Sequence, residues 1–502
     1  MDVLALVRTV RLATLVAVLA VGAAVPASAE GADVGHRVAN LTVPNSVACP
    51  APNQPCDRKV KVHLWYPADQ TGFSQAPKTE YTSALYRRAL PAPWAPLDWK
   101  VEAEIARETD TIDPHGQPFP VIVFSHGSTN DPIDYAHTLE LIAAEGFIVA
   151  APYHANNTQD DVRIDFINGR AGTTLFPCND GLAPPCSRPN VPNSMRDRIR
   201  DISYILDALP DWFGDRVDAS RAGVLGHSRG TLTALAAAGG SDAWGIEPET
   251  RVKAIMGMAI ATANLTNMVN RAAVTVPTVL VAGGRDQNTP QAVSESAFAA
   301  ISSADKLFVA IPNATHRSFD STYCAQLQSA GANVKSNPNA ILDLHTVGLI
   351  AASPPGFLSG KAVHYCAPAF FTSPVNIQRV VASIPNAEYF CSGAEPPGLG
   401  DQLDPSCSLI PPVAGPPSPC VTTSIPCTGL ATEEVKQGVK EIAAAFFDSA
   451  LKRTGNDGIH FTRYLAPKWL MKHLPMVGSA KAHAGPGSVC PPGQGVICAR
   501  TR

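Results

Sequence analysis

The chain has 502 residues, of which 45% are hydrophobic and 16% are charged, and its formal net charge is −4. This composition is typical of a globular protein, and a weak negative charge without clustered lysines and arginines argues against nucleic-acid binding. The length allows one large domain with insertions, or two domains.

The first 29 residues have the three parts of a secretory signal. Arg8 and Arg11 precede an apolar run over residues 12–25, and the small residues Ala27-Ser28-Ala29 follow it. This order is typical of a cleaved signal peptide, and the run is shorter than the roughly 18 residues expected of a membrane span. We therefore expect residues 1–29 to be removed and the mature chain to be secreted, extracellular or periplasmic, without a transmembrane span.

Twelve cysteines lie beyond the signal. An even number of cysteines in an exported chain predicts disulfide bonds. Near neighbours in the sequence suggest four local pairs, namely Cys49 with Cys56, Cys178 with Cys186, Cys420 with Cys427, and Cys490 with Cys498. The other four would pair among themselves, namely Cys324, Cys366, Cys391 and Cys407. A metal site is the alternative, but it needs thiolates grouped at short spacing, usually with histidines, which this sequence lacks.

Strand and helix patterns alternate over residues 120–316. An earlier segment, "KVKVHLWYP", alternates apolar and polar residues as a half-buried antiparallel strand does. The later segments are, in chain order, strand "PVIVFSHG", helix "YAHTLELIAAEG", strand "FIVAAPYH", helix Ser194 to Leu209, strand "AGVLG", helix Arg229 to Ala238, strand "VKAIMGMA" and strand "PTVLVAGGRD". Strands that are apolar on both faces and alternate with helices predict an α/β fold, with a mostly parallel sheet and helices on both faces.

The pattern changes after residue 319, which we take as the end of a core that begins at residue 30. Residues 320–428 are rich in proline and cysteine and resemble an insertion or cap held by disulfides. Residues 429–474 would complete the core, because residues 432–451 form an amphipathic helix. Its apolar positions fall on one face, namely Val435, Val439, Ile442, Phe446 and Phe447. Residues 475–502 form a Gly- and Pro-rich tail.

One pentapeptide, Gly226-His227-Ser228-Arg229-Gly230, fits the pattern Gly-x-Ser-x-Gly. A strand pattern precedes it and a helix pattern follows it, which is the context of a nucleophile elbow in a parallel sheet. Small residues are expected at both glycine positions, because the turn brings strand and helix backbones close. We interpret Ser228 as a nucleophile and His227 as a packing residue beside it.

A serine alcohol needs a base and an orienting acid. In this architecture they follow the serine in the order acid, then histidine. Asp286 ends the strand "PTVLVAGGRD", and His316 follows the strand-like "KLFVAIPNA". These two residues complete the predicted triad, while Asp305 and Asp320 are the spare carboxylates.

An oxyanion hole needs two backbone donors. The amide of Arg229 is the first, and the amide of Ser128, in the loop after "PVIVFSHG", is the predicted second. An ordinary Gly turn at the strand end is the alternative for this loop. The loop after "PVIVFSHG" does not contain the H-G-G-G run that forms the oxyanion hole in one group of lipases.

These segments together resemble an α/β-hydrolase, close to the platelet-activating-factor acetylhydrolase and "predicted dienelactone hydrolase" group, with some likeness to chlorophyllases. The segments that carry the resemblance are "PFPVIVFSHGS", "LELIAAEGFIVAAPYHANNT", "RIRDISYILDAL", "ASRAGVLGHSRGTLTALAA", "PTVLVAGGRD" and "NATHRSF". The resemblance implies the α/β-hydrolase fold, and it implies the triad and oxyanion roles given above. Dienelactone hydrolase proper uses a cysteine nucleophile, so lactone chemistry is not implied.

The sequence thus predicts a serine hydrolase that cleaves small-molecule or lipid esters and needs no metal or organic cofactor. An amidase or peptidase with the same triad is one alternative. A non-catalytic surface binding protein, in which residues 320–428 make the contact, is the other. An active-site fluorophosphonate separates the binding protein from the enzymes, because it labels only an activated serine.

Overall fold

The computed structural model describes residues 32–46, 56–82, 100–128, 130–154, 158, 191–261, 263–284, 286, 289–312, 314, 316–322, 429–452 and 465–483. The predicted signal, most of residues 320–428 and the end of the tail lie outside these ranges. The predicted disulfides lie outside them as well, and Cys56 is described only as the first residue of a strand.

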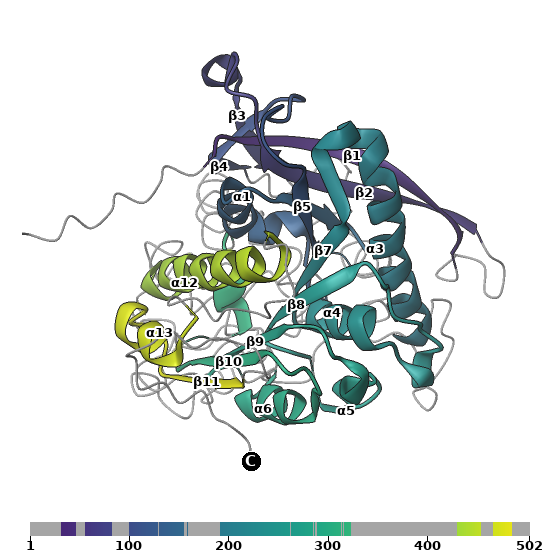
Figure 1. Cartoon of the computed structure of the whole chain (residues 1–502), viewed down its shortest axis with the longest axis vertical. Coiled ribbons are helices and arrows are strands. Elements are labelled where there is room, and N and C mark those ends of the chain that lie inside the picture. Colours follow the sequence, from purple (N-terminus) through teal and green to yellow (C-terminus); the bar gives the residue numbers. More distant parts are fainter. Residues whose placement is uncertain are drawn as a thin grey trace, which may run out of the picture.

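The described part is built on one eleven-stranded sheet with the order β11-β10-β9-β8-β7-β5-β6-β2-β1-β4-β3 (Figure 1). The strands are β1 Val34–Ser46, β2 Cys56–Pro67, β3 Lys78–Thr82, β4 Lys100–Glu108, β5 Phe119–Ser125, β6 Ile148–Pro152, β7 Val217–His227, β8 Val252–Met258, β9 Thr278–Gly283, β10 Lys306–Ile311 and β11 Ser479–His483. Every neighbouring pair from β6 to β10 is parallel. Antiparallel pairs join β1 to β2, β2 to β6, β3 to β4, and β10 to β11. The predicted α/β class, with a mostly parallel sheet, is therefore confirmed.

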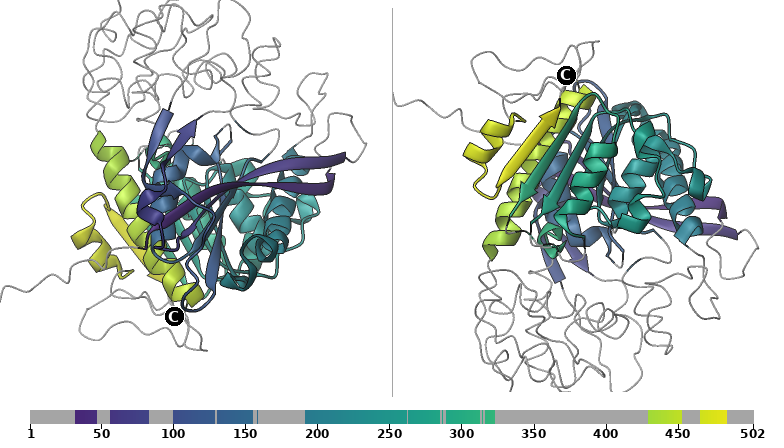
Figure 2. Two further views of the ribbon diagram at one scale, coloured as in Figure 1. Left: turned by 90° about the horizontal axis from the view of Figure 1, so that it is seen from above. Right: turned by 90° about the horizontal axis from the view of Figure 1, so that it is seen from below.

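Helices cover both faces of the sheet (Figures 1 and 2). They are α1 Ala136–Ala144, α3 Val191–Phe213, α4 Arg229–Gly239, α5 Ala263–Thr266, α6 Gln291–Ala300, α12 Gly429–Phe447 and α13 Pro467–His473. The central strands have no polar face, as β5 illustrates. Its Ile122 and Phe124 pack with α1 and α12, whereas Val121 and Val123 pack with α3 and α4. Such strands need cover on both sides, which the helices provide.

Helix α12 packs its apolar stripe on the sheet, as the sequence predicts. Val435, Val439, Ile442, Phe446 and Phe447 are all at most 2% exposed. Phe447 also explains a glycine in β7, because a Cβ at Gly223 would lie 2.5 Å from the Phe447 ring. A segment far along the chain thus packs directly behind the strand that leads to Ser228.

Some features of the structure differ from the sequence prediction. Helix α6 was not predicted between Asp286 and His316, and no strand was predicted in the Gly- and Pro-rich tail, where β11 pairs with β10. Residues 320–322, expected in the insertion, pack in the core. The Thr322 amide donates to the Asp134 carbonyl at 2.9 Å, and its hydroxyl donates to the Ile133 carbonyl at 2.7 Å. These residues therefore pack against the segment that carries the short helix η3 Pro132–Tyr135.

Candidate active site

Ser228 lies at the carboxyl end of β7, immediately before α4. Its φ is 54° and its ψ is −117°, a backbone conformation that residues with a side chain rarely adopt. The Ser228 amide donates to the carbonyl of Met258 at the end of β8, at 2.9 Å. The serine is 8% exposed, so its side chain stands at the edge of the core rather than inside it. This is the sharp strand-to-helix turn expected of a nucleophile elbow.

Both glycines of the pentapeptide are sterically required. A Cβ on Gly226 would lie 2.1 Å from the Gly230 carbonyl oxygen, which confirms the predicted close approach of strand and helix. A Cβ on Gly230 would lie 1.7 Å from the carbonyl oxygen of Ser125. The second glycine therefore makes room for the end of β5, a different neighbour from the one expected.

Asp286 and His316 are brought together. Asp286 follows β9, His316 begins the short helix η7 His316–Phe319, and His316 Nδ1 donates to Asp286 Oδ2 at 2.7 Å. The Asp286 side chain is fully buried, whereas that of His316 is 13% exposed. A buried carboxylate on Nδ1 holds the imidazole in the tautomer that leaves Nε2 free to accept a proton.

Thr289 supports Asp286, and the sequence analysis missed it. Its amide donates to Asp286 Oδ1 at 2.8 Å and its hydroxyl donates to Oδ2 at 2.7 Å. The hydroxyl also lies 3.2 Å from His316 Nδ1. An Asp followed three residues later by Thr is a local turn pattern that the sequence does contain.

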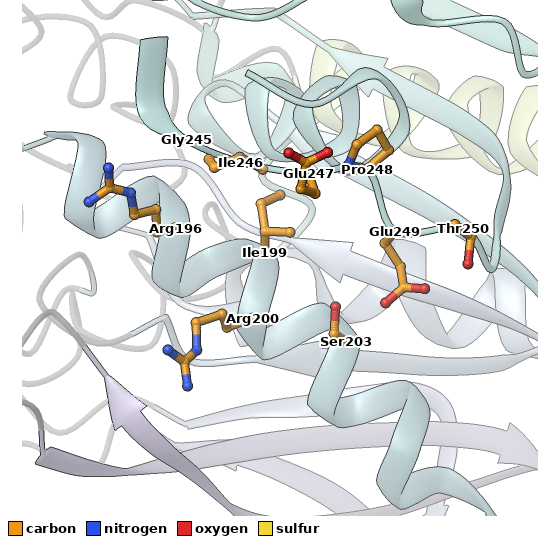
Figure 3. A pocket seen from close by; sticks show the side chains of 10 residues that line it. All are labelled: Arg196, Ile199, Arg200, Ser203, Gly245, Ile246, Glu247, Pro248, Glu249 and Thr250. Carbon is orange, nitrogen blue, oxygen red and sulfur yellow. The ribbon is translucent and has the colours of Figure 1, made fainter. Parts of the chain in front are cut away.

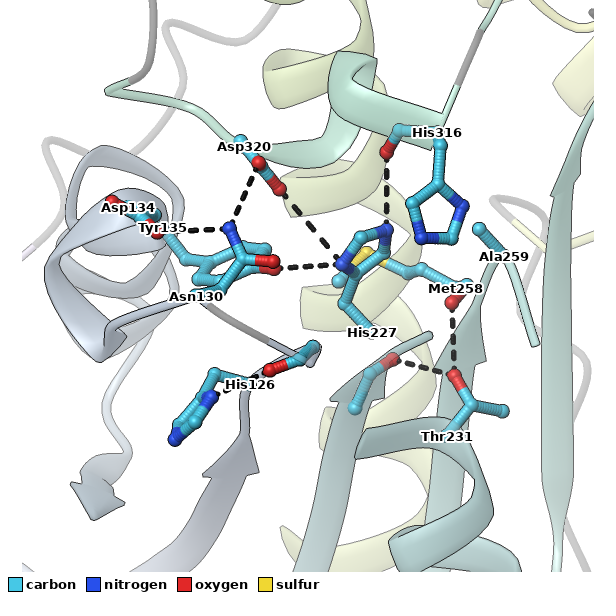
Figure 4. Close-up of polar contacts among 12 residues, drawn as sticks. His126, Asn130, Asp134, Tyr135, His227, Thr231, Met258, Ala259, His316 and Asp320 are labelled. Carbon is cyan, nitrogen blue, oxygen red and sulfur yellow. Dashed lines mark hydrogen bonds and ion pairs between the residues drawn. The ribbon is translucent and has the colours of Figure 1, made fainter. Parts of the chain in front are cut away.

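The structure brings Ser228 to this pair through its neighbour His227, whose ring centroid lies 4.6 Å from that of His316 (Figure 4). No hydrogen bond joins the Ser228 hydroxyl to His316 among the described residues; such bonds are often long before substrate binds. Of the spare carboxylates, Asp305 precedes β10 and lies at the opposite end of the sheet from Asp286. Asp320 is buried, with Oδ1 3.8 Å from His227 Nδ1.

The loop after β5 lies against Ser228. A Cβ built on Gly127 would be 3.4 Å from the Ser228 Cβ, and Ser128 next to it is half-buried. His126 donates from Nδ1 to the Gly127 carbonyl at 2.7 Å. Burial lowers the pKa of His126 well below its ordinary value, so this ring is neutral. The loop containing the predicted Ser128 donor and the α4 terminus containing the Arg229 amide thus flank the same serine.

The Arg229 side chain is an unexpected feature of this terminus. It is 7% exposed, and its Nε and Nη1 atoms are buried without a hydrogen-bond partner. Burial lowers its pKa to about 10, so the guanidinium is still charged at neutral pH. Burying a charge without a hydrogen-bond partner costs folding free energy, so the Arg229 side chain is an unfavourable feature of this turn.

A second Ser-His-Asp arrangement lies inside the core, and the sequence analysis missed it. The Ser125 hydroxyl is 2.9 Å from His154 Nε2, and His154 Nδ1 is 2.8 Å from Asp201 Oδ2. Burial lowers the pKa of His154 well below its ordinary value, so the neutral ring donates to Asp201 and accepts from Ser125. All three residues are at most 1% exposed. A substrate cannot reach this serine, so we assign the arrangement a structural role.

Figure 4 shows a third network, which surrounds His227. Tyr135 Oη lies 2.7 Å from His227 Nδ1, and His227 Nε2 lies 3.1 Å from the main-chain carbonyl oxygen of His316. Asn130 donates to Asp134 at 2.8 Å and to Asp320 at 3.0 Å. The network therefore links the segment after the predicted oxyanion loop, the turn at Ser228 and the segment that carries His316.

A groove with a volume of about 560 Å³ lies elsewhere, between α3 and the segment 245–250 (Figure 3). Charged side chains of both signs line it, namely Arg196, Arg200, Glu247 and Glu249. None of the predicted site residues lines it, so it is separate from the candidate site.

The described residues contain no group of three or more His, Cys, Asp or Glu side chains arranged to hold a metal ion. Within the same ranges, no helix is long and apolar enough to cross a bilayer.

No protein-family model and no curated protein matches the chain. Among solved structures, a ferulic acid esterase from Streptomyces cinnamoneus is 23% identical, with a TM-score of 0.38 over 59% of this chain and 77% of that one. A dienelactone hydrolase from Anabaena variabilis is 17% identical, with a TM-score of 0.32 over 60% and 94% of the two chains. A cold-adapted esterase from an Arctic intertidal metagenomic library is 15% identical, with a TM-score of 0.33 over 57% and 86%. These TM-scores are below 0.5, so any function has to rest on the residues of the site.

Proposed function

We propose that this protein is a secreted serine hydrolase of the α/β-hydrolase type that cleaves carboxylic esters through Ser228, His316 and Asp286. The observation that carries the proposal is the 2.7 Å hydrogen bond from His316 Nδ1 to the buried Asp286, with the His316 ring 4.6 Å from that of His227, the residue before a serine at φ 54°. An oriented imidazole and a strained elbow serve acyl transfer together. A binding platform requires neither.

In the proposed reaction, the Ser228 hydroxyl attacks the ester carbonyl while His316 Nε2 takes the hydroxyl proton. Asp286 stabilises the imidazolium that forms. The negative oxygen of the tetrahedral intermediate accepts hydrogen bonds from the amides of Ser128 and Arg229, each worth about 3 kcal/mol in comparable sites. Collapse expels the alcohol, which receives the proton from His316. Water, activated by the same histidine, then hydrolyses the acyl-enzyme.

The proposal is tested by labelling purified protein with a fluorophosphonate and locating the adduct by mass spectrometry. We expect one adduct on Ser228 that is lost in Ser228→Ala. Ser125→Ala is the matched control, because Ser125 also contacts a histidine that contacts an aspartate, but it is buried. Labelling should survive in Ser125→Ala. An unlabelled wild type would support the binding protein instead.

Hydrolysis of p-nitrophenyl esters of graded acyl length, beside the matched p-nitroanilides, separates an esterase from an amidase. We expect the esters to be cleaved far faster than the anilides. Asp286→Asn should lower kcat by about 10⁴-fold, because it favours the wrong tautomer of His316. Export is tested separately, by determining the N-terminus of the protein recovered outside the cytoplasm. Cleavage after Ala29 is the expected result.

A further inference from the structure

We propose that His227 is a positioning residue that holds the catalytic histidine through its backbone, with Tyr135 holding His227 in turn. This inference rests on the proposed function, since it assumes that His316 is the base. It changes the role expected for His227, from a packing residue to a hydrogen-bonding one.

His227 Nε2 lies beside a hydrogen-bond acceptor. The acceptor beside Nε2 is the main-chain carbonyl oxygen of His316, at 3.1 Å, and a carbonyl can only accept. His227 Nε2 therefore carries a hydrogen, whether the ring is neutral or protonated. The ring is fully buried, so water does not compete for this hydrogen bond. The elbow thus donates directly to the backbone of the residue that must receive the Ser228 proton.

A hydrogen bond and ring contacts hold the His227 ring in place. Its Nδ1 lies 2.7 Å from the hydroxyl of Tyr135, which is itself 1% exposed. The rings of Tyr135 and Phe319 lie 5.5 Å and 5.7 Å from that of His227. Hydrogen bonds at both nitrogens and rings at two sides leave the imidazole little freedom to rotate.

Tyr135 connects His227 to the segment that follows the predicted oxyanion loop. It ends the short helix η3 Pro132–Tyr135, which begins five residues after Gly127 of the predicted oxyanion loop and four residues after Ser128. The amide of Asp131, at the start of η3, donates to the Asp134 carboxylate at 2.9 Å, which fixes this turn. The oxyanion loop, the nucleophile and the base are therefore connected through one imidazole.

The consequence is kinetic. The side chain of His316 is tied to Asp286, while its backbone is tied to His227, so two contacts define the position of Nε2 relative to Ser228. Loss of the second contact leaves the His316–Asp286 pair intact but lets it shift away from the serine. Displacements near 1 Å can cost about 100-fold in rate. Substrate binding needs no proton transfer, so kcat should fall and KM should not.

The test compares His227→Leu with His227→Gln in the full-length secreted protein. Leucine removes the donor, whereas a glutamine amide restores a donor near the position of Nε2. We expect kcat to fall about 10- to 100-fold in His227→Leu with KM unchanged, and to recover to within about threefold in His227→Gln. His63→Leu is the control, because His63 is also buried and hydrogen-bonded to a histidine, at 2.9 Å, but lies on β2. That variant should retain wild-type kcat per folded molecule.

Tyr135→Phe tests the support beneath His227, with Tyr81→Phe as its control. Tyr81 likewise has a buried hydroxyl, which accepts from the Trp65 indole at 2.8 Å outside the site. Tyr135→Phe should lower kcat about threefold, and this loss should disappear in the His227→Leu background, because the two side chains act through one path. Rates are normalised to fluorophosphonate-reactive sites, which removes any effect of misfolding.

The outcomes separate the two proposals. A wild-type protein without esterase activity or label would overturn the proposed function. An active wild type whose kcat is unchanged in His227→Leu, or whose loss is not recovered by His227→Gln, would overturn the positioning role alone. A change confined to thermal stability, with normal kcat per reactive site, would likewise reduce His227 to a packing residue.

Discussion

The backbone at Ser228 stores strain that a glycine would release. With φ at 54° and ψ at −117°, the Cβ of this residue is held in a sparsely populated region. Such a conformation costs of order 1–3 kcal/mol. Ser228→Ala keeps the Cβ and the strain, whereas Ser228→Gly removes both. Both variants lack the hydroxyl, so both should be inactive, and only their stabilities should differ.

The size of the difference follows from two opposing terms. Relief of strain contributes about 2 kcal/mol, and the extra freedom of glycine in the unfolded chain costs roughly 0.5–1 kcal/mol. We therefore expect Ser228→Gly to exceed Ser228→Ala by about 1 kcal/mol in unfolding free energy, or about 2 °C in Tm for a core of this size. Urea unfolding followed by circular dichroism measures the difference.

At an ordinary helix position, substitution by glycine should lower the unfolding free energy instead of raising it, and such a position serves as the control. Ala444 is half-buried in the interior of α12, and Ala444→Gly should lower stability by about 1 kcal/mol. A Ser228→Gly variant that is no more stable than Ser228→Ala would refute the argument, because it would mean that the elbow stores no strain.

Three further predictions concern the support of the site. Gly230→Ala places a Cβ 1.7 Å from the Ser125 carbonyl oxygen, so we expect a loss of more than about 2 kcal/mol in unfolding free energy, together with loss of fluorophosphonate labelling. Arg229→Met removes a buried charge whose Nε and Nη1 lack partners, so chemical denaturation should show a gain of about 1–3 kcal/mol; an unchanged or lower stability would mean that the charge is compensated. Burial raises the pKa of Glu140 to about 7, although the backbone amides of residues 104, 105 and 106 donate hydrogen bonds to its carboxylate and oppose this rise. Because the folded state holds this proton to higher pH than the unfolded chain, its contribution to stability falls as pH rises from about 4.5 to 7, by up to about 3 kcal/mol, and stays constant above. Unfolding free energies measured across this range should lose that slope in Glu140→Gln; an unchanged slope would assign it to other groups.

The parts of the fold that were predictable have a strong local signal. Residues 120–124 and 279–282 are continuous apolar runs, and a strand covered by helices on both faces buries every side chain of such a run. The need for a glycine at 226 was predictable because the carbonyl that it meets, that of Gly230, lies only four residues later in the sequence. The pairing of Asp286 with His316 was predictable because parallel strands bring their carboxyl ends to one edge of the sheet.

The unpredicted parts depend on contacts between distant segments. Strand β11, "SAKAH", has no apolar run, and it is a strand only because β10 offers it an edge. The hydroxyl of Ser125 meets His154 across 29 residues, and His154 meets Asp201 across 47. Nothing in the spacing of these residues distinguishes them from isolated polar side chains. The donor role of His227 was hidden in the same way, since its acceptor is a main-chain carbonyl 89 residues later.

The two Ser-His-Asp arrangements differ in what their serine can do. Ser125 Oγ accepts from Arg198 Nη1 at 3.0 Å while it donates to His154, so its lone pairs and its proton are engaged inside the core. Arg198 Nη1 also donates to the His126 carbonyl at 2.8 Å, which connects this buried network to the loop after β5. Among the described residues, the Ser228 hydroxyl has no such partner, and Ser228 lies on a strained turn at the edge of the core. The Ser125 arrangement therefore has a structural role, whereas Ser228 is the serine that we propose as the nucleophile.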